Sequence, residues 1–228
     1  MIEIYSFKID EEIDGRVFAH LMKQLDENKQ AAIKRYLRRE DSQRALVSEA
    51  LARLVIMDGL KINNSGMRFG KNQFGKPFLL EYPGFHFNVS HSGEWVVCAV
   101  DDEDIGIDVE EICCIDIKIA DRFFSRQEVA DINSKPEAER LPYFYDIWTL
   151  KESYIKAWGK GLSVPLDSFS LSKGSNGEIL LTTCNSFNKC FFRQYDIDSG
   201  YKMSVCALKN QFPDRVKQKR IWDLLKIG

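Results

Sequence analysis

One order of elements occurs twice along this chain: a long helical pattern, then a strand, a glycine-containing turn and a second strand. Apolar residues recur at helical spacing over 41–57 and again over 143–158, and glycines follow both stretches. The closing strands, 96–100 and 203–208, are also alike in sequence. This repeat predicts an α+β fold of two similar α/β halves, packed as an intramolecular pseudo-dimer with a ligand cleft between them.

The chain is long enough for this arrangement, since 228 residues with 44% hydrophobic content can fill one large core or two small ones. We expect the halves at 1–104 and 105–212, followed by a C-terminal tail at 213–228. Other patterns predict a basic helix over 26–39, strands over 85–90, 95–100 and 105–112, helical structure over 119–132, a polar loop over 133–142, and strands over 169–171, 179–182, 190–195 and 201–208.

Composition excludes several classes of protein. The formal net charge of −2 argues against nucleic acid as the main partner. No apolar stretch approaches the roughly 20 residues needed to cross a bilayer, and the first residues lack the pattern of a signal peptide. The six cysteines show no CxxC spacing, so we expect reduced thiols and a cytoplasmic protein without a membrane partner.

Two carboxylates share one face of the strand predicted over 105–112. Strand side chains alternate, so the apolar residues point into a core while Gly106, Asp108 and Glu110 point the other way. Two carboxylates on one face repel each other unless a cation or water separates them. Gly106 is expected to leave room beside them for a large ligand. The alternative is a solvated edge-strand face.

A third carboxylate lies on the helix predicted over 143–158. Trp148, Glu152 and Lys156 follow the spacing i, i+4, i+8 and share one stripe. An ordinary Glu–Lys helix pair, worth about 0.3–0.5 kcal/mol, is the alternative interpretation. Three carboxylates without a histidine or cysteine cluster favour Mg²⁺, with Mn²⁺ as an alternative, over Zn²⁺. Beside lysines, such a site suits phosphate chemistry.

Two further segments suit an anionic ligand. His91, flanked by Ser90 and Ser92, forms a small polar cradle, although a histidine at a strand end is usually a turn residue. The turn at 75–77 offers a backbone wall and a lysine for a nucleotide. The alternative is an ordinary turn that only connects two elements. No P-loop and no G-x-G-x-x-G motif occurs.

Taken in order, these segments resemble the 4′-phosphopantetheinyl transferases, specifically the longer Sfp type of peptide and polyketide synthesis. The resemblance runs from about residue 2 to residue 212, and its length fits the pseudo-dimeric monomer rather than the half-length, trimeric synthases. The motifs that carry it are Phe74-Gly75-Lys76-Pro77, Phe87-Asn88-Val89-Ser90-His91-Ser92, Gly106-Ile107-Asp108-Val109-Glu110, Phe123-Phe124-Ser125 with Glu128, and the segment 148–156.

The resemblance implies coenzyme A as donor, an apo carrier protein of peptide, polyketide or fatty-acid synthesis as acceptor, and Mg²⁺ or Mn²⁺ as cofactor. It also implies that the first half contacts the adenine and 3′-phosphate, and that the second half holds the metal and receives the carrier near 159–190. The metal ligands implied are Asp108, Glu110 and Glu152. The coenzyme A-binding residues implied are Lys29, Arg44, Gly75, Lys76, Pro77, Asn88, Ser90, His91, Asp108, Glu152 and Lys156. The catalytic residues implied are Glu152, Lys156, Asp108, Glu110 and His91.

Ala32 and Ala45 depart from the pattern, because close relatives carry a lysine and a threonine there, near the 3′-phosphate. In the implied reaction the carrier serine loses its proton to Glu152, Glu110 or a metal-polarised water and attacks the phosphate that bears pantetheine. Adenosine 3′,5′-bisphosphate then leaves, with its charge neutralised by Lys156.

Two other functions remain as alternatives: a Mg²⁺-dependent hydrolase of nucleotide diphosphate bonds, and a non-catalytic coenzyme A or carrier-binding module. The basic tail also allows two interpretations. Its lysines and arginines could steer an acidic carrier protein, or 214–227 could be a frayed, solvated helix, which the composition favours.

Overall fold

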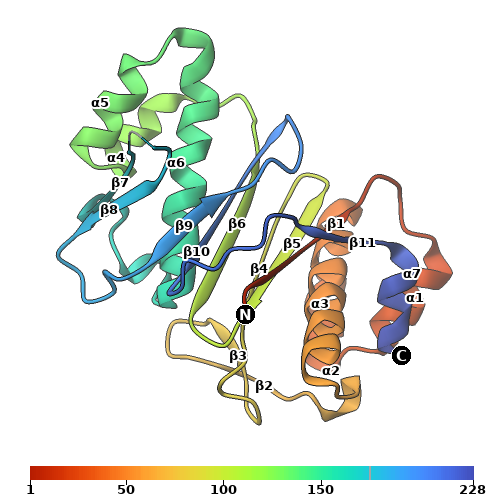
Figure 1. Cartoon of the computed structure of the whole chain (residues 1–228). Helices are drawn as coiled ribbons and strands as arrows, with labels where there is room; N and C mark the ends of the chain where they lie inside the picture. Colours follow the sequence, from red (N-terminus) through yellow and green to blue (C-terminus); the bar gives the residue numbers. More distant parts are fainter. Residues whose placement is uncertain (175) are drawn as a thin grey trace.

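The computed structural model describes residues 1–174 and 176–228, and its helices and strands are labelled in Figure 1. The first half of the chain contains β1 (Glu3–Lys8), α1 (Gly15–Lys23), α2 (Glu27–Lys34), α3 (Arg39–Leu60), β2 (Phe69–Lys71), β3 (Pro77–Leu79), β4 (His86–Ser92) and β5 (Trp95–Asp101). The second half contains β6 (Ile105–Glu111), α4 (Ala120–Phe123), α5 (Arg126–Ser134), α6 (Glu137–Trp158), β7 (Phe169–Lys173), β8 (Ile179–Thr183), β9 (Phe191–Gln194) and β10 (Tyr201–Ala207). The C-terminal tail contains β11 (Lys217–Lys219) and α7 (Ile221–Leu224).

In the first half, α3 packs on the β4–β5 hairpin. The sheet has the order β11-β1-β5-β4, with β1 antiparallel to β5 and parallel to β11. Glu40 and Asp41 lie in the first turn of α3, where negative charge is favourable, and the helix ends at Lys61 in a left-handed conformation. Its buried face joins the helix-facing side chains of β5 in one core.

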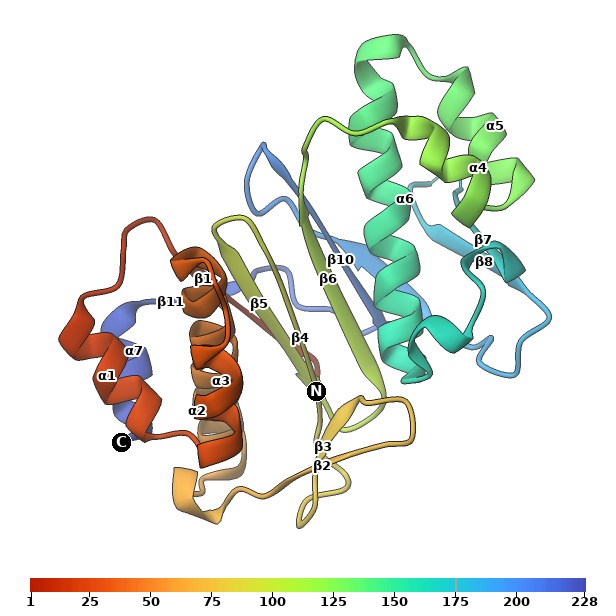
Figure 2. The same cartoon turned by 180° about the vertical axis from the view of Figure 1, so that it is seen from behind.

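In the second half, α6 packs on β6 and β10 in the same way. The sheet here has the order β6-β10-β9, and β7 and β8 form a separate hairpin. Figures 1 and 2 show α3 on one side of the molecule and α6 on the other, with the strands between them. The predicted α+β fold with two similar halves is confirmed.

The faces of the strands that turn away from α3 and α6 share a third core. Trp95, Val97 and Ala99 of β5 meet the alternating apolar residues of β6 and β10 there. The interior position predicted for Ile105, Ile107 and Val109 is therefore confirmed, because all three are buried in this core. The other face of β6 turns toward α6, which positions the polar residues of that strand.

Three predicted boundaries are wrong. The basic helix predicted over 26–39 already ends at Lys34, the last residue of α2. The loop predicted over 133–142 is largely helical, because α6 already begins at Glu137. Glu137 and Glu139 in its first turn favour the helix N-terminus, and α6 continues through Pro142 although the proline removes one intrahelical hydrogen bond. The helix predicted over 119–132 is interrupted at Ser125, where a capping box with Glu128 starts a new helix.

The C-terminal tail is not a frayed helix. Its β11 strand pairs with β1, and Leu224 and Ile227 are buried against the core of the first half. Two of the basic side chains form ion pairs with that half, Lys217 with Glu3 and Lys219 with Asp58. Within the described residues, no helix has the length and apolarity that a membrane crossing requires.

Candidate active site

Asp108 is the most buried carboxylate of the predicted site. It lies on the α6-facing side of β6 and is 2% exposed. Its Oδ1 atom accepts hydrogen bonds from Lys156 Nζ at 2.6 Å and from Ser90 Oγ at 2.9 Å. Its Oδ2 atom is buried and has no hydrogen-bond partner among the described residues. A buried acceptor of this kind is costly unless something binds it, so this atom marks a place for a cation or donor.

The edges of β4 and β6 meet without backbone pairing, and side chains bridge them instead. Asn88 Oδ1 accepts from the backbone nitrogen of Ile107 at 2.9 Å. Further along β4, Ser90 donates to Asp108 and Ser92 Oγ donates to Glu110 Oε2 at 2.8 Å. The contacts advance in the same direction along both strands. The alternating polar residues of β4 therefore join the two halves and hold both carboxylates of β6.

Lys156 links α6 to this seam. Its Nζ atom bonds both Asp108 and Ser90, the latter at 2.9 Å. The ion pair of Lys156 is thus made across elements, and the alternative of an ordinary Glu152–Lys156 helix pair is not what the structure shows. Glu152, one turn earlier on α6, is partly buried beside them. Glu152 and Lys156 of the predicted stripe therefore lie beside Asp108, whereas Trp148 packs against Phe124 and Phe144.

The pKa values follow from this crowding. Burial, then the charge of Asp108, raises the pKa of Glu110 to about 7. Burial and then Asp108 also raise the pKa of Glu152, and burial raises the pKa of Asp108 itself against the lowering effect of Lys156. The three carboxylates lie close enough to destabilise one another's charge, which a bound cation would relieve.

Gly106 does not leave room for a ligand, and that prediction is wrong. A Cβ atom at this position would lie 2.1 Å from the carbonyl oxygen of Ser153 and 2.3 Å from the backbone nitrogen of Ala157. The space is filled by the backbone of α6. The glycine instead allows α6 to approach β6 closely, and this brings Glu152 and Lys156 within reach of Asp108.

A cavity of about 1080 Å³ lies between α2, α3, β4 and the β2–β3 hairpin. Lys29, Asn88 and Pro77 of the predicted coenzyme A-binding residues line it. Lys29 is ion-paired with Glu49. Arg44, also among the implied coenzyme A-binding residues, does not line this cavity; it bonds Asp41 and donates to the carbonyl oxygen of Gly93 at 3.0 Å.

The remaining predicted residues lie at the edges of the site. His91 follows Ser90 on β4 with an exposed side chain, and the protein groups that displace water around its ring, then the charges of Arg44 and Lys156, lower its pKa. Gly75 forms the hairpin turn with a φ of 92°, which favours glycine. The Lys76 amine is turned away from the cavity and into the seam, where it donates to Ala157 and Ile105 carbonyl oxygens.

Two polar features were not predicted. The first is the hydrogen bond from Ser92 to Glu110. The sequence indicates it indirectly, because Ser92 continues the polar alternation of Asn88 and Ser90 along the strand. Lys151 of α6 and Glu128 of α5 form a fully buried ion pair at 2.8 Å. Glu128 stood within a recognised motif, but no local pattern indicates its partner on α6.

Comparison with known proteins identifies the family. A model described as the 4′-phosphopantetheinyl transferase superfamily matches residues 104–206, and one described as 4′-phosphopantetheinyl transferase, N-terminal, matches 14–103. The 4′-phosphopantetheinyl transferase Sfp of Bacillus subtilis is 38% identical over 224 residues, which cover 98% of this chain and 100% of that protein. The 4′-phosphopantetheinyl transferase gsp of Aneurinibacillus migulanus is 40% identical, over 91% of this chain and 86% of its own.

Among solved structures, the holo-[acyl-carrier-protein] synthase of Helicobacter pylori in complex with coenzyme A aligns with 45% of this chain and 97% of its own, at 21% identity and a TM-score of 0.38. The curated relatives are transferases by name, and they give no support to a hydrolase or to a binding module. With relatives this similar over nearly its whole length, the chain belongs to the 4′-phosphopantetheinyl transferases of the Sfp type.

Proposed function

We propose that this chain holds the pyrophosphate of coenzyme A on a divalent cation bound by Asp108, Glu110 and Glu152. As an Sfp-type enzyme it transfers the 4′-phosphopantetheine group of coenzyme A to a serine of an apo carrier protein. The observation that carries the metal proposal is the buried, unpartnered Oδ2 atom of Asp108, in the part of the chain that is described. It lies beside two further carboxylates whose pKa values are raised.

The donor set fits Mg²⁺, with Mn²⁺ as the alternative, because hard cations prefer carboxylate oxygens. Across residues 1–174 and 176–228, no three acidic, histidine or cysteine side chains already stand together as a metal cluster. The fit therefore rests on the chemistry of the donors and on the free oxygen of Asp108. When bound, the cation would neutralise the diphosphate and make the bisphosphate a better leaving group.

The side chains around this position neutralise the leaving group and accept the proton of the carrier serine. Lys156, held between Asp108 and Ser90, carries the positive charge for the departing bisphosphate. The serine hydroxyl of the carrier forms the new bond to the pantetheine-bearing phosphorus as the bond to the bridging oxygen breaks. Its proton passes to Glu152 or Glu110, the two carboxylates that lie beside Asp108.

The nucleotide part of coenzyme A is proposed to occupy the cavity lined by Lys29, Asn88 and Pro77, with His91 and Arg44 near the phosphates. Ala32 and Ala45 weaken the expected hold on the 3′-phosphate without touching the chemistry. The volume of about 1080 Å³ supports a nucleotide-sized ligand.

The carrier protein is proposed to dock near 159–190. Leu162 is 81% exposed and Leu180 is 49% exposed, so this segment presents apolar side chains to solvent. Residue 175, which falls within it, lies outside the described residues. The proposal also includes a monomer in the cytoplasm, with neither nucleic acid nor membrane as partner. All six cysteines are free thiols, which a reducing compartment would maintain.

The test is mass spectrometry of an apo carrier protein incubated with the enzyme, coenzyme A and Mg²⁺. We expect the gain of one phosphopantetheine on the carrier serine, and Asp108→Asn should slow this transfer on the order of a hundredfold or more. Glu111→Gln, on the neighbouring exposed position of β6, is the matched control and should transfer at the wild-type rate. Near-wild-type transfer by Asp108→Asn would refute the metal assignment.

A further inference from the structure

The tip of the β2–β3 hairpin, residues 72–76, crosses from the first half to the C-terminal end of α6. Asn72 Oδ1 accepts hydrogen bonds from the backbone nitrogens of Phe74 and Lys76 at 2.9 and 3.0 Å, and this fixes the turn. Its other side-chain atom, Nδ2, donates to the carbonyl oxygen of Gly159 at 2.7 Å. One side chain thus shapes the hairpin and binds the end of the helix that carries Glu152 and Lys156.

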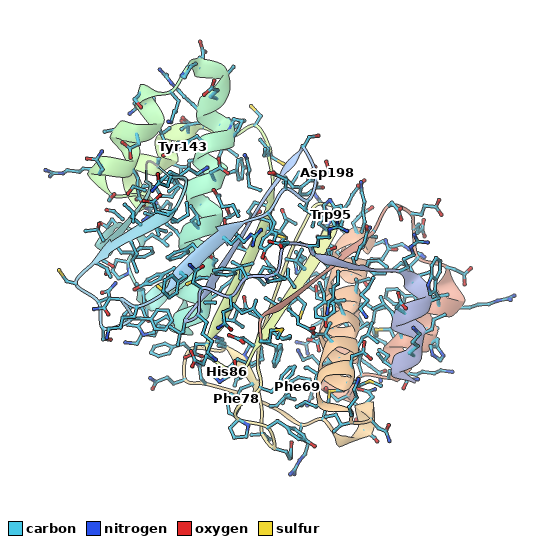
Figure 3. The ribbon with its side chains drawn as sticks, viewed as in Figure 1. Phe69, Phe78, His86, Trp95, Tyr143 and Asp198 are labelled. Atoms are coloured by element: carbon cyan, nitrogen blue, oxygen red, sulfur yellow. The ribbon has the colours of Figure 1, made fainter. Side chains whose placement is uncertain are left out.

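Lys76 makes the second connection. Its Nζ atom donates to the carbonyl oxygen of Ala157 at 2.9 Å and to that of Ile105 at 3.3 Å. The side chain is only 15% exposed, and Asp104, 3.7 Å away, is the nearest counter-charge. His86 of β4, labelled near the lower end of the strands in Figure 3, contacts the same Asp104 at 3.1 Å.

The end of α6 requires such donors. The last carbonyls of a helix have no partner within it, and buried ones need a bond from elsewhere. Gly159 ends α6 at a φ of 72°, and a Cβ atom there would lie 2.9 Å from Lys76 Cδ. The left-handed glycine and the lysine are therefore packed against each other, and the hairpin supplies what the helix end lacks.

We propose that Asn72 and Lys76 are positioning residues that set where Lys156 lies relative to Asp108. Ala157 follows Lys156 directly on α6, and Ile105 precedes Asp108 by three residues on β6. One ammonium group therefore ties together the two elements whose side chains meet at the reaction site. This role replaces the expectation that the Lys76 side chain binds the nucleotide. The inference deepens the proposed function and rests on it.

Steady-state kinetics with coenzyme A and an apo carrier protein test this role. Lys76→Met should lower kcat between tenfold and a hundredfold, since small displacements of catalytic groups have effects of that order. The KM for coenzyme A and the Kd for adenosine 3′,5′-bisphosphate should stay within about twofold of wild type, because the amine faces the seam. Asn72→Ala should lower kcat in the same way, and the double variant should lose less than the product of the single effects.

Two further variants separate positioning from other roles. Lys76→Arg keeps hydrogen-bond donors toward the two carbonyl oxygens and should retain most of kcat. If Lys76→Met does not fold, the kinetics of Lys76→Arg and Asn72→Ala test the positioning role instead. Lys209→Met, which removes an exposed lysine paired with Asp102, is the control and should behave as wild type.

Several results would overturn the inference. A Kd raised tenfold with kcat unchanged would make Lys76 a nucleotide ligand. An unchanged kcat in both Lys76→Met and Asn72→Ala would remove the positioning role altogether. Absence of transfer by the wild-type enzyme would instead refute the proposed function, so the two failures can be told apart.

Discussion

The two long helices, α3 and α6, have the same length of 22 residues and the same place on their strands, but they bury charge differently. On α3, the guanidinium of Arg53 bonds the neutral amide of Asn64 at 2.8 Å and lies 3.5 Å from Asp26, which is half exposed. On α6, the amine of Lys151 is fully buried and is paired with an equally buried Glu128 at 2.8 Å. The first half keeps its buried cation near solvent, whereas the second half encloses a complete ion pair.

The second half also depends on the first for its polar contacts. Ser90 and Ser92 of β4 hold the carboxylates of β6, and Lys76 donates to the end of α6. The α3 helix, in contrast, lines the large cavity. The same backbone arrangement therefore carries a cluster of carboxylates beside α6 in one half and a cavity beside α3 in the other.

Removal of the buried cation from each half should give the largest difference in stability between the two halves. Lys151→Met leaves Glu128 buried without its counter-charge and should lower the free energy of unfolding by about 3–5 kcal/mol. Arg53→Met removes a hydrogen bond to an amide and a 3.5 Å ion pair with the half-exposed Asp26, and should lower the free energy of unfolding by about 1–3 kcal/mol. Urea unfolding of both variants gives the two values. Equal losses, or a larger loss for Arg53→Met, would show that the halves do not differ in this way.

A smaller effect should come from the contact between helix and strand. In the first half, β5 meets α3 through side chains such as Val96 and Cys98. In the second, Gly106 lets the backbones approach, so Gly106→Ala forces α6 outward and should lower the free energy of unfolding by about 1–3 kcal/mol.

Gly15→Ala at the start of α1 is the control for Gly106→Ala, because a Cβ atom at residue 15 meets nothing within 4 Å. Thermal unfolding of the two variants should separate them by several degrees. If Gly106→Ala were as stable as Gly15→Ala, the close approach of α6 would not be required.

Much of the fold was predictable because its signals are local. The periodicity of 41–57 and 143–158 gave both long helices, and strand alternation gave the interior position of Val109 and the opposite face of Asp108. The tail was mispredicted because its partner strand, β1, lies some 200 residues away in sequence, and the charge of a segment does not indicate whether its few apolar residues are buried.

The seam was less predictable for the same physical reason. Ser92 and Glu110 lie on strand edges that have no backbone pairing, so no register links them in the sequence. The side chain of Lys76 belongs to a turn, which has no period to show where it points. A motif indicated that this lysine matters, but only the three-dimensional contacts indicate that it binds the end of α6.

The smallest predicted effect concerns the pH dependence of the second half, which contains Glu110. The pKa of Glu110 is raised to about 7, so in the metal-free fold the contribution of this group to stability is fully present below its ordinary value of 4.5 and is lost as the pH rises through 7. At the proposed metal site a proton and a divalent cation would compete for this carboxylate, so binding below pH 7 would release the proton. The affinity for Mg²⁺, measured by calorimetry with adenosine 3′,5′-bisphosphate bound, should rise about fivefold (about 1 kcal/mol) from pH 6 to pH 7, roughly twofold more to pH 8, and level off above. Glu110→Gln should bind Mg²⁺ more weakly and without this slope, whereas an unchanged slope in that variant would assign the titrating proton to Asp108 or Glu152.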